Sequence, residues 1–127
     1  MKPLSVARDL KRRRARERSG LFVAEGVRCV EELLASSVAV RCVVISPALR
    51  QTGRGQGLES AIRATAASRG LELTEASDAE LSAAASTDTP QGIVAIAVQP
   101  ERSFENIPGS GLVLLLDAIQ DPGNVGT

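Results

Sequence analysis

Hydrophobic residues recur along the chain in short blocks with two different periods. Four blocks are apolar or alternating and end near Gly or Pro, which predicts β-strands over residues 21–24, 40–45, 71–74 and 93–98. In other blocks the apolar residues are three or four positions apart, which predicts helices over residues 3–18, 27–36, 58–69 and 78–85. The last of these helices begins at a Ser77-x-x-Glu80 capping box.

The order of these elements predicts the fold class. One helix is followed by three β-α pairs and a final strand. Such alternation is typical of an α/β domain with three layers, in which a mostly parallel sheet carries helices on both faces. We expect this domain to occupy residues 1–99. Within it, residues 47–57 are expected to form a surface loop, because Gly53, Gly55 and Gly57 match neither GxGxxG nor a P-loop.

The last 28 residues have a different character. Residues 100–111 are polar and rich in Pro and Gly, which indicates a linker. The aliphatic run 112–116 then predicts a strand buried on both faces, of the kind that opens a second parallel sheet. No helix and no partner strand follow it in this sequence. From the residues alone, the turn with Pro, Gly and Asn after this strand is either a plain structural turn or a ligand-facing loop at the end of the strand.

The composition excludes several kinds of chemistry. The chain has no His, which removes Ser-His-Asp triads, HExxH zinc sites and histidine base catalysis. It has two Phe and no Trp or Tyr, so aromatic platforms for stacking bases are not expected. Cys29 and Cys42 do not form a CxxC motif and are interpreted as buried small hydrophobic residues in a reducing compartment. No metal site is expected.

The net charge of zero hides a strong asymmetry. Residues 1–18 hold eight basic and two acidic residues, whereas residues 19–127 hold seven basic and thirteen acidic ones, so the front carries +6 and the remainder −6. A local excess of this size indicates a face that binds a polyanion. The candidate RNA-binding residues are Lys11, Arg12, Arg13, Arg14, Arg16 and Arg18. From charge alone, a solvated helix end is an equally open interpretation.

Targeting signals are not evident. The basic N-terminus is not followed by the apolar run of a signal peptide, and the longest apolar run, residues 112–116, is far shorter than a membrane span. We expect a soluble, cytoplasmic protein with no membrane partner.

Three strings resemble SpoU-type (TrmH-like) RNA ribose 2'-O-methyltransferases of the SPOUT superfamily. The most specific is Asp121-Pro122-Gly123-Asn124-Val125-Gly126-Thr127 after the aliphatic run, which is similar to the first catalytic motif of that family. Two weaker ones, Arg16 with Ser19-Gly20-Leu21-Phe22-Val23-Ala24-Glu25-Gly26, and Thr89-Pro90-Gln91-Gly92-Ile93, are similar to signatures of the family's N-terminal substrate-binding domain.

The resemblance implies that RNA binding and catalysis belong to different domains. Residues 1–99 would form a ribosomal-protein-like domain that holds structured RNA, either rRNA or tRNA, and residues 112–127 would begin a knotted methyltransferase domain. Asn124 would be its one matched catalytic residue. The Arg that partners it in the family would fall at position 130, beyond this sequence. The intact enzyme would use S-adenosylmethionine and dimerise through the knotted domain, whereas this chain is expected to bind no cofactor and to be inactive alone.

Two alternatives stay open from the sequence. One is a stand-alone RNA-binding module of the kink-turn type without catalysis. The other is an α/β scaffold that binds no nucleic acid and whose basic helix is only solvated.

Overall fold

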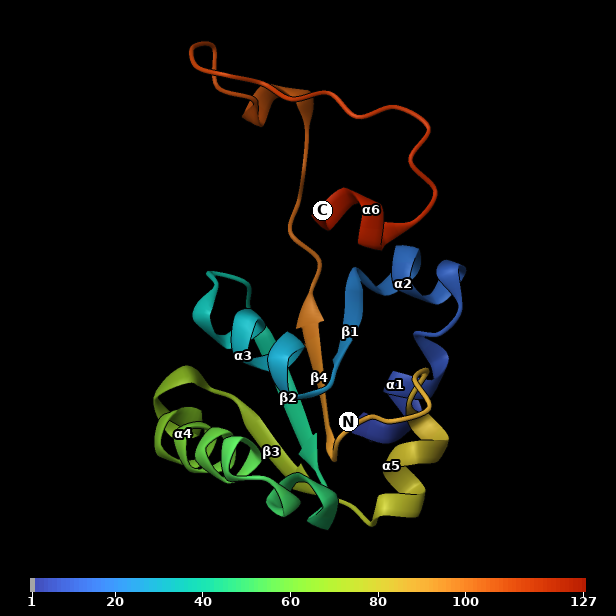
Figure 1. Cartoon of the computed structure of the whole chain (residues 1–127), viewed down its shortest axis with the longest axis vertical. Helices are drawn as coiled ribbons and strands as arrows, with labels where there is room; N and C mark the ends of the chain where they lie inside the picture. The colour runs from blue at the N-terminus through green and yellow to red at the C-terminus, as the bar shows by residue number, and fades with distance from the viewer. Residues whose placement is uncertain (1) are drawn as a thin grey trace.

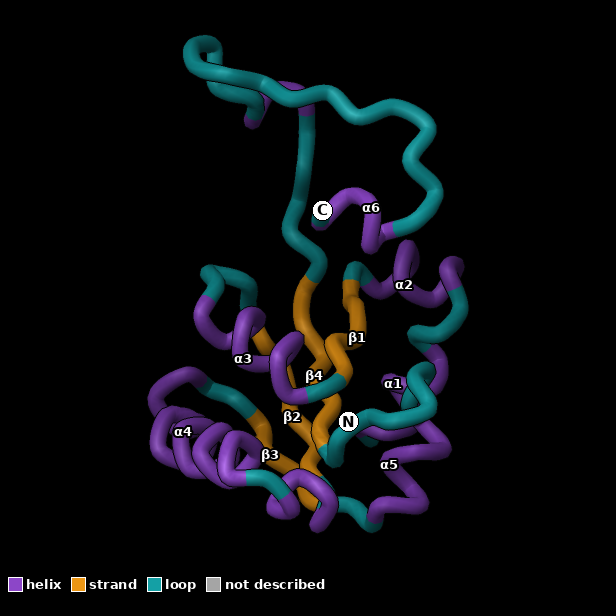
Figure 2. Tube along the Cα trace, viewed as in Figure 1, coloured by secondary structure: helices purple, strands orange, loops and turns teal. Residues whose placement is uncertain are grey.

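A computed structural model describes residues 2–127, and a single four-stranded sheet lies at its centre (Figures 1 and 2). The strands are β1 (Leu21–Glu25), β2 (Val40–Ile45), β3 (Glu72–Glu75) and β4 (Ile93–Val98). The α-helices are α1 (Pro3–Asp9), α2 (Arg13–Ser19), α3 (Val27–Ala35), α4 (Gly53–Arg69), α5 (Asp78–Ala84) and α6 (Pro122–Gly126). The short 3₁₀ helices are η1 (Pro47–Gln51) and η2 (Phe104–Asn106).

The expected α/β class is confirmed, with a sheet that is mixed rather than purely parallel. The strand order is β1-β4-β2-β3, and β4 runs antiparallel to both of its neighbours. Strands β1, β2 and β3 run in one direction, and the neighbouring pair β2–β3 is parallel. The sequence pattern showed that helices connect the strands, but it carries no information on the direction of each strand. After α5 the connection 85–92 turns the chain so that β4 enters between β1 and β2 in the opposite sense.

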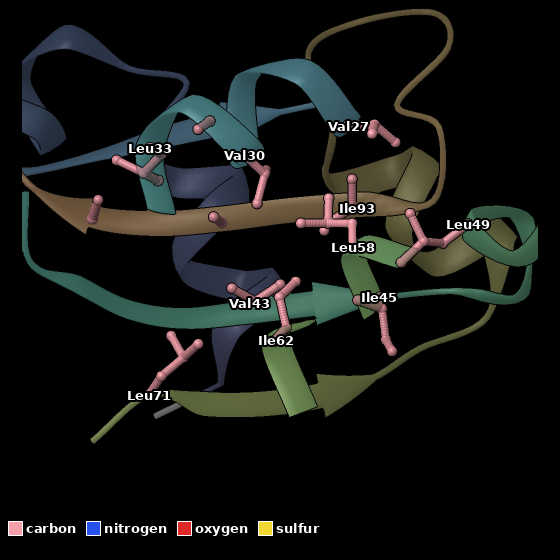
Figure 3. Packing of buried hydrophobic residues seen from close by; sticks show 13 residues of the cluster. Val27, Val30, Leu33, Val43, Ile45, Leu49, Leu58, Ile62, Leu71 and Ile93 are labelled. Atoms are coloured by element: carbon pink, nitrogen blue, oxygen red, sulfur yellow. The ribbon is translucent and has the colours of Figure 1, made fainter. Parts of the chain in front are cut away.

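The expected three layers are present. Alternate residues of the central strands point to opposite faces, as pleating requires. Val43 and Ile45 of β2 pack with α3 and α4, whereas Cys42 and Val44 pack with α1 and α5. Both central strands are therefore buried on two sides, which explains why their sequences are almost continuously apolar. Figure 3 shows the α3–α4 side of this core.

The first predicted helix is broken into two. Leu10 caps α1, and Arg12 is in an extended conformation before α2 begins. Helix α1 packs against α5 and β2, whereas α2 packs against β1, and one straight helix of this length cannot follow both surfaces. The predicted apolar stripe is confirmed, because Ala7 and Leu10 are buried and Leu4 packs beside them.

The glycine-rich segment is a helix start, so the predicted loop at residues 47–57 was wrong. Thr52 caps α4 by accepting a hydrogen bond from the Gly55 amide at 3.0 Å. A Cβ on Gly55 would lie 1.9 Å from the carbonyl oxygen of Leu49, so the absence of a side chain allows η1 and α4 to touch. Gly55 thus serves close packing, whereas a Cβ on Gly53 or Gly57 would meet nothing within 4 Å.

The predicted strand at residues 112–116 does not form. All residues from Gln99 onward are exposed, and the run from Leu112 to Leu116 pairs with no strand among residues 2–127. A strand is stable only when another strand satisfies its backbone, and the described chain offers the run no such partner. In the part of the chain that the structure describes, no helix has the length and hydropathy to cross a membrane.

Candidate functional site

The basic segment predicted to bind RNA lies at the α1–α2 junction and along α2, beside the start of β1 (Figure 1). All of its cations are exposed except Arg16, which is half-buried. Five exposed cations therefore lie within residues 11–18, at the α1–α2 junction and along α2, and we call this segment the basic face.

Three of these exposed cations have acidic neighbours. Arg12 contacts Asp9, Arg13 Nε lies 2.6 Å from Glu17 Oε1, and Arg18 lies 3.9 Å from Asp9. The three arginine side chains are 78–83% exposed, so such pairs contribute little to stability and exchange readily for other anions. Lys11 and Arg14 make no ion pair within residues 2–127. These arginines can therefore leave their acidic neighbours and contact the phosphates of a polyanion with little loss of folding stability.

Arg16 has a structural role that the sequence pattern did not indicate. One of its terminal nitrogens donates hydrogen bonds of 2.9 Å to the carbonyl oxygens of both Leu10 and Lys11. These carbonyls lie where α1 ends, so they have no partner within the helix. Arg16 thus fastens the α1–α2 junction, and replacing it would disturb the geometry of the whole basic face.

A second candidate site is a cleft of about 540 Å³ at the other end of β1, between the starts of α3 and α4. It is lined by Glu25, Gly26, Val27, Arg28, Cys29, Ala48, Gln51, Thr52, Arg54 and Gln91. Sequence reasoning did not find this site, because its residues come from three separate segments.

The two shorter strings that resemble the family, which end at Gly26 and include Gln91, meet at this cleft and are joined by a hydrogen bond. The backbone amide of Val27 donates a 2.9 Å hydrogen bond to Gln91 Oε1, across 64 positions of sequence. Gly26 and Gln91 both have positive φ angles, of 87° and 55°. A Cβ on Gly26 would lie 3.2 Å from Gln91 Oε1, so glycine at this position leaves room for the amide. A positive φ at a residue other than glycine costs free energy, so the surrounding contacts must hold Gln91 in this conformation.

Glu25 is the acidic residue among those that line the cleft. Its carboxylate accepts hydrogen bonds from the amides of Ser86 (2.7 Å) and Thr87 (2.9 Å) and from the Thr87 hydroxyl (2.9 Å). Burial by itself would raise the pKa of Glu25, but these hydrogen bonds together outweigh it and lower the pKa. Glu25 is therefore an ionised anchor for residues 86–87, with its acceptor capacity largely used.

Arg54 lies at the mouth of the cleft and is paired across the two helices. Its Nε is 2.9 and 3.0 Å from the two carboxylate oxygens of Glu31, and a terminal nitrogen is 2.5 Å from Oε2. The hydrogen bonds from Arg54 are the main reason that the pKa of Glu31 is lowered, and the charge of Arg28 adds to the effect. Arg28 itself is exposed and has no ion pair within residues 2–127.

The two cysteines differ, which corrects one expectation. Cys42 is buried in the sheet, and burial raises the pKa of its thiol to about 11. Cys29 is exposed at the cleft rim, because it lies on the outer side of the first turn of α3. Both thiols are free.

The predicted catalytic Asn124 lies on α6, an exposed turn whose start is capped by Asp121 through a 2.8 Å hydrogen bond from the Gly123 amide. The structure does not bring Asn124 together with the cleft residues. Among residues 2–127, no group of His, Cys, Asp or Glu has the arrangement of a metal site.

Comparison with known proteins gives concordant matches. The family described as the MRM3-like substrate binding domain matches residues 5–95. The 23S rRNA (guanosine(2553)-2'-O)-methyltransferase RlmP of Bacillus subtilis (strain 168) is 32% identical over 120 residues, covering 94% of this chain and 42% of RlmP.

Solved structures show the same relationship. One described as an RNA 2'-O ribose methyltransferase superposes with a TM-score of 0.73 and 26% identity, over 98% of this chain and 46% of its own. The SpoU methyltransferase AviRb from Streptomyces viridochromogenes, in complex with AdoMet, has a TM-score of 0.63 at 19% identity, over 87% of this chain and 38% of its own, and supports the fold alone. The chain spans less than half the length of each of these proteins.

Proposed function

The chain belongs to the MRM3-like substrate binding domain family, and from this premise we propose that it holds the RNA substrate of an S-adenosylmethionine-dependent rRNA ribose 2'-O-methyltransferase. The resemblance to SpoU-type methyltransferases noted in the sequence is confirmed at the level of the family. The whole protein would act as a homodimer and carry out the methyl transfer, and residues 1–99 would position the RNA.

The observation that carries the proposal is the exposed cationic face of α2 and the preceding turn. Its exposed charges are Lys11, Arg12, Arg13, Arg14 and Arg18. Cations that meet phosphates release condensed counterions, and this release makes binding salt-dependent. Phosphate contacts of this kind position an RNA without reading its sequence, as a substrate-holding domain requires.

The test is a salt titration of affinity for structured rRNA fragments, with the variant Arg12→Ala/Arg13→Ala/Arg14→Ala. If three phosphate contacts are lost, the slope of log K against log salt should flatten by about two to three units. Arg16 is left in place because it fastens the helix junction. The fold should persist, since the three arginines are exposed and the buried Ala7 and Leu10 are untouched.

The matched control is Arg41→Ala/Arg102→Ala, which removes exposed cations outside α1, α2 and the cleft. It should bind RNA like the original chain. If the triple variant keeps the original affinity and slope, the α2 face does not bind RNA. A stand-alone RNA-binding module of the kink-turn type, which has no catalytic domain, would give the same result in this experiment.

A second expectation concerns the cofactor. We expect the 127-residue chain to give no saturable heat with S-adenosylmethionine in calorimetry, because residues 121–127, which resemble the first catalytic motif, are all exposed and Asn124 lines none of the cleft described above. Saturable binding at micromolar cofactor concentration would mean that these 127 residues themselves form a cofactor site. We also propose that the protein works in the cytoplasm, where its two thiols stay reduced.

A further inference from the structure

The cleft between α3 and α4 is lined by the guanidinium groups of Arg28 and Arg54 and by the side-chain amides of Gln51 and Gln91, all of which can donate hydrogen bonds. Gln91 Oε1 must be the acceptor for the Val27 amide, because that amide can only donate. The amide of Gln91 is thereby fixed, and its Nε2 carries two donors with no acceptor within residues 2–127. Arg28 adds an unpaired guanidinium on the same wall.

The acidic side chains at the cleft are already engaged. Glu25 is held by three hydrogen bonds from Ser86 and Thr87, and Glu31 is held by Arg54. The Thr52 hydroxyl accepts from the Gly55 amide. The ionised Glu25 carboxylate also lines the cleft, so the place for an anion is at the Arg28 guanidinium and the Gln91 amide, whose N–H donors suit a compact group rich in oxygen acceptors.

We propose that this cleft is a second RNA-contact site, which takes one phosphodiester group of the RNA backbone between Arg28 and the fixed amide of Gln91. This inference rests on the proposed RNA-binding function and adds to it a separate point of contact. The cleft lies at the Glu25 end of β1 and the basic face at its Leu21 end, so the length of β1, about 15 Å, separates them. Two anchors this far apart fix both the position and the direction of a bound RNA.

Glu31 limits how tightly the cleft binds the RNA phosphate. It occupies Arg54 with a bidentate pair at the cleft mouth, so it competes with the RNA phosphate for that guanidinium. Removing the negative charge of Glu31 releases Arg54 to the phosphate. Glu31→Gln is therefore expected to bind RNA more tightly than the original chain, by about five- to tenfold at low salt.

The decisive variant is Gln91→Glu. A glutamate keeps an Oε acceptor for the Val27 amide and sits favourably at the start of α3, so the thermal midpoint should not fall. It replaces the donor with a negative charge, so RNA affinity should fall at least about tenfold. Arg28→Ala should weaken binding about five- to tenfold and flatten the salt slope by roughly one unit, as expected for one lost phosphate contact.

Arg41→Ala serves as the control, and the α2 triple variant separates the two sites. If the original chain binds no RNA, both the proposed function and this inference fail. If the triple variant weakens binding while Gln91→Glu and Arg28→Ala bind normally, only the cleft is overturned as a site. If a nucleoside monophosphate alone binds at micromolar concentration and Gln91→Glu abolishes it, the cleft takes a free phosphorylated molecule and the RNA assignment is wrong.

Discussion

Replacing Gly92 by Ala is expected to unfold the domain or to lower its free energy of unfolding by at least about 3 kcal/mol. A Cβ at this position would lie 2.2 Å from the backbone nitrogen of Leu49 and 2.9 Å from the carbonyl carbon of Ala48. Both are backbone atoms and cannot swing aside. Gly92 also has φ of 74°, which an alanine adopts only at a cost.

The position matters because the backbone of Leu49 is enclosed on two sides. Gly92 touches its nitrogen and Gly55 touches its carbonyl oxygen, while its side chain is fully buried in the α3–α4 core (Figure 3). Pushing Leu49 away would disturb η1, the start of α4 and one wall of the cleft together. We therefore expect Gly92→Ala to lose RNA binding as well as stability.

The control is Gly57→Ala in the same protein. Gly57 is exposed in α4, and nothing lies within 4 Å of the position its Cβ would take. Alanine is the better helix former, so this variant should gain about 0.5–1 kcal/mol. Denaturant unfolding followed by circular dichroism measures both variants. Equal stability of Gly92→Ala and the original chain would show that the turn at residues 90–92 is wrongly placed.

Replacing Glu59 by Ala is expected to lower the free energy of unfolding by about 2–3 kcal/mol at neutral pH. Glu59 is 9% exposed and lies on α4 between two arginines. Arg50 donates two hydrogen bonds of 2.8 Å to its carboxylate, and Arg63 Nε donates one of 3.0 Å. Both arginines also contact Glu75 on β3, so the network joins η1, α4 and β3.

The pH dependence follows from the direction of the pKa shift. The hydrogen bond from Arg50 is the largest influence, and with Arg63 it outweighs burial and lowers the pKa of Glu59 below the ordinary value of 4.5. A lowered folded-state pKa stabilises the fold fully above the unfolded-state value and loses that contribution as the pH falls through the folded-state value. The difference in stability between the original chain and Glu59→Ala should therefore be full at pH 7 and shrink below about pH 4.5.

The charge-matched control is Glu72→Gln on β3, an exposed carboxylate that makes no ion pair within residues 2–127. It should change stability by less than about 0.5 kcal/mol. Denaturant titrations at pH 7 and in the acid range measure all three proteins. If the penalty of Glu59→Ala stays constant down to pH 3, the network does not stabilise the fold through the ionised carboxylate.

Local features of the fold followed from the sequence alone. The bounds of β2 and β4 agree with the apolar blocks, and the Ser77–Glu80 capping box has both of its hydrogen bonds. The family was also evident, because its motifs are contiguous strings. Such features depend on residues a few positions apart, and side-chain periodicity reports directly which side of an element is buried.

Features that depend on distant segments were decided by the tertiary structure. The direction of β4 and the break before α2 depend on which surfaces those elements cover. The role of Gly55 depends on the approach of Leu49. The cleft required Gln91 to reach the start of α3, 64 positions away. A single sequence records the periodicity of each element but not the close approach of two backbones, so packing alone brought Arg28, Arg54 and Gln91 together.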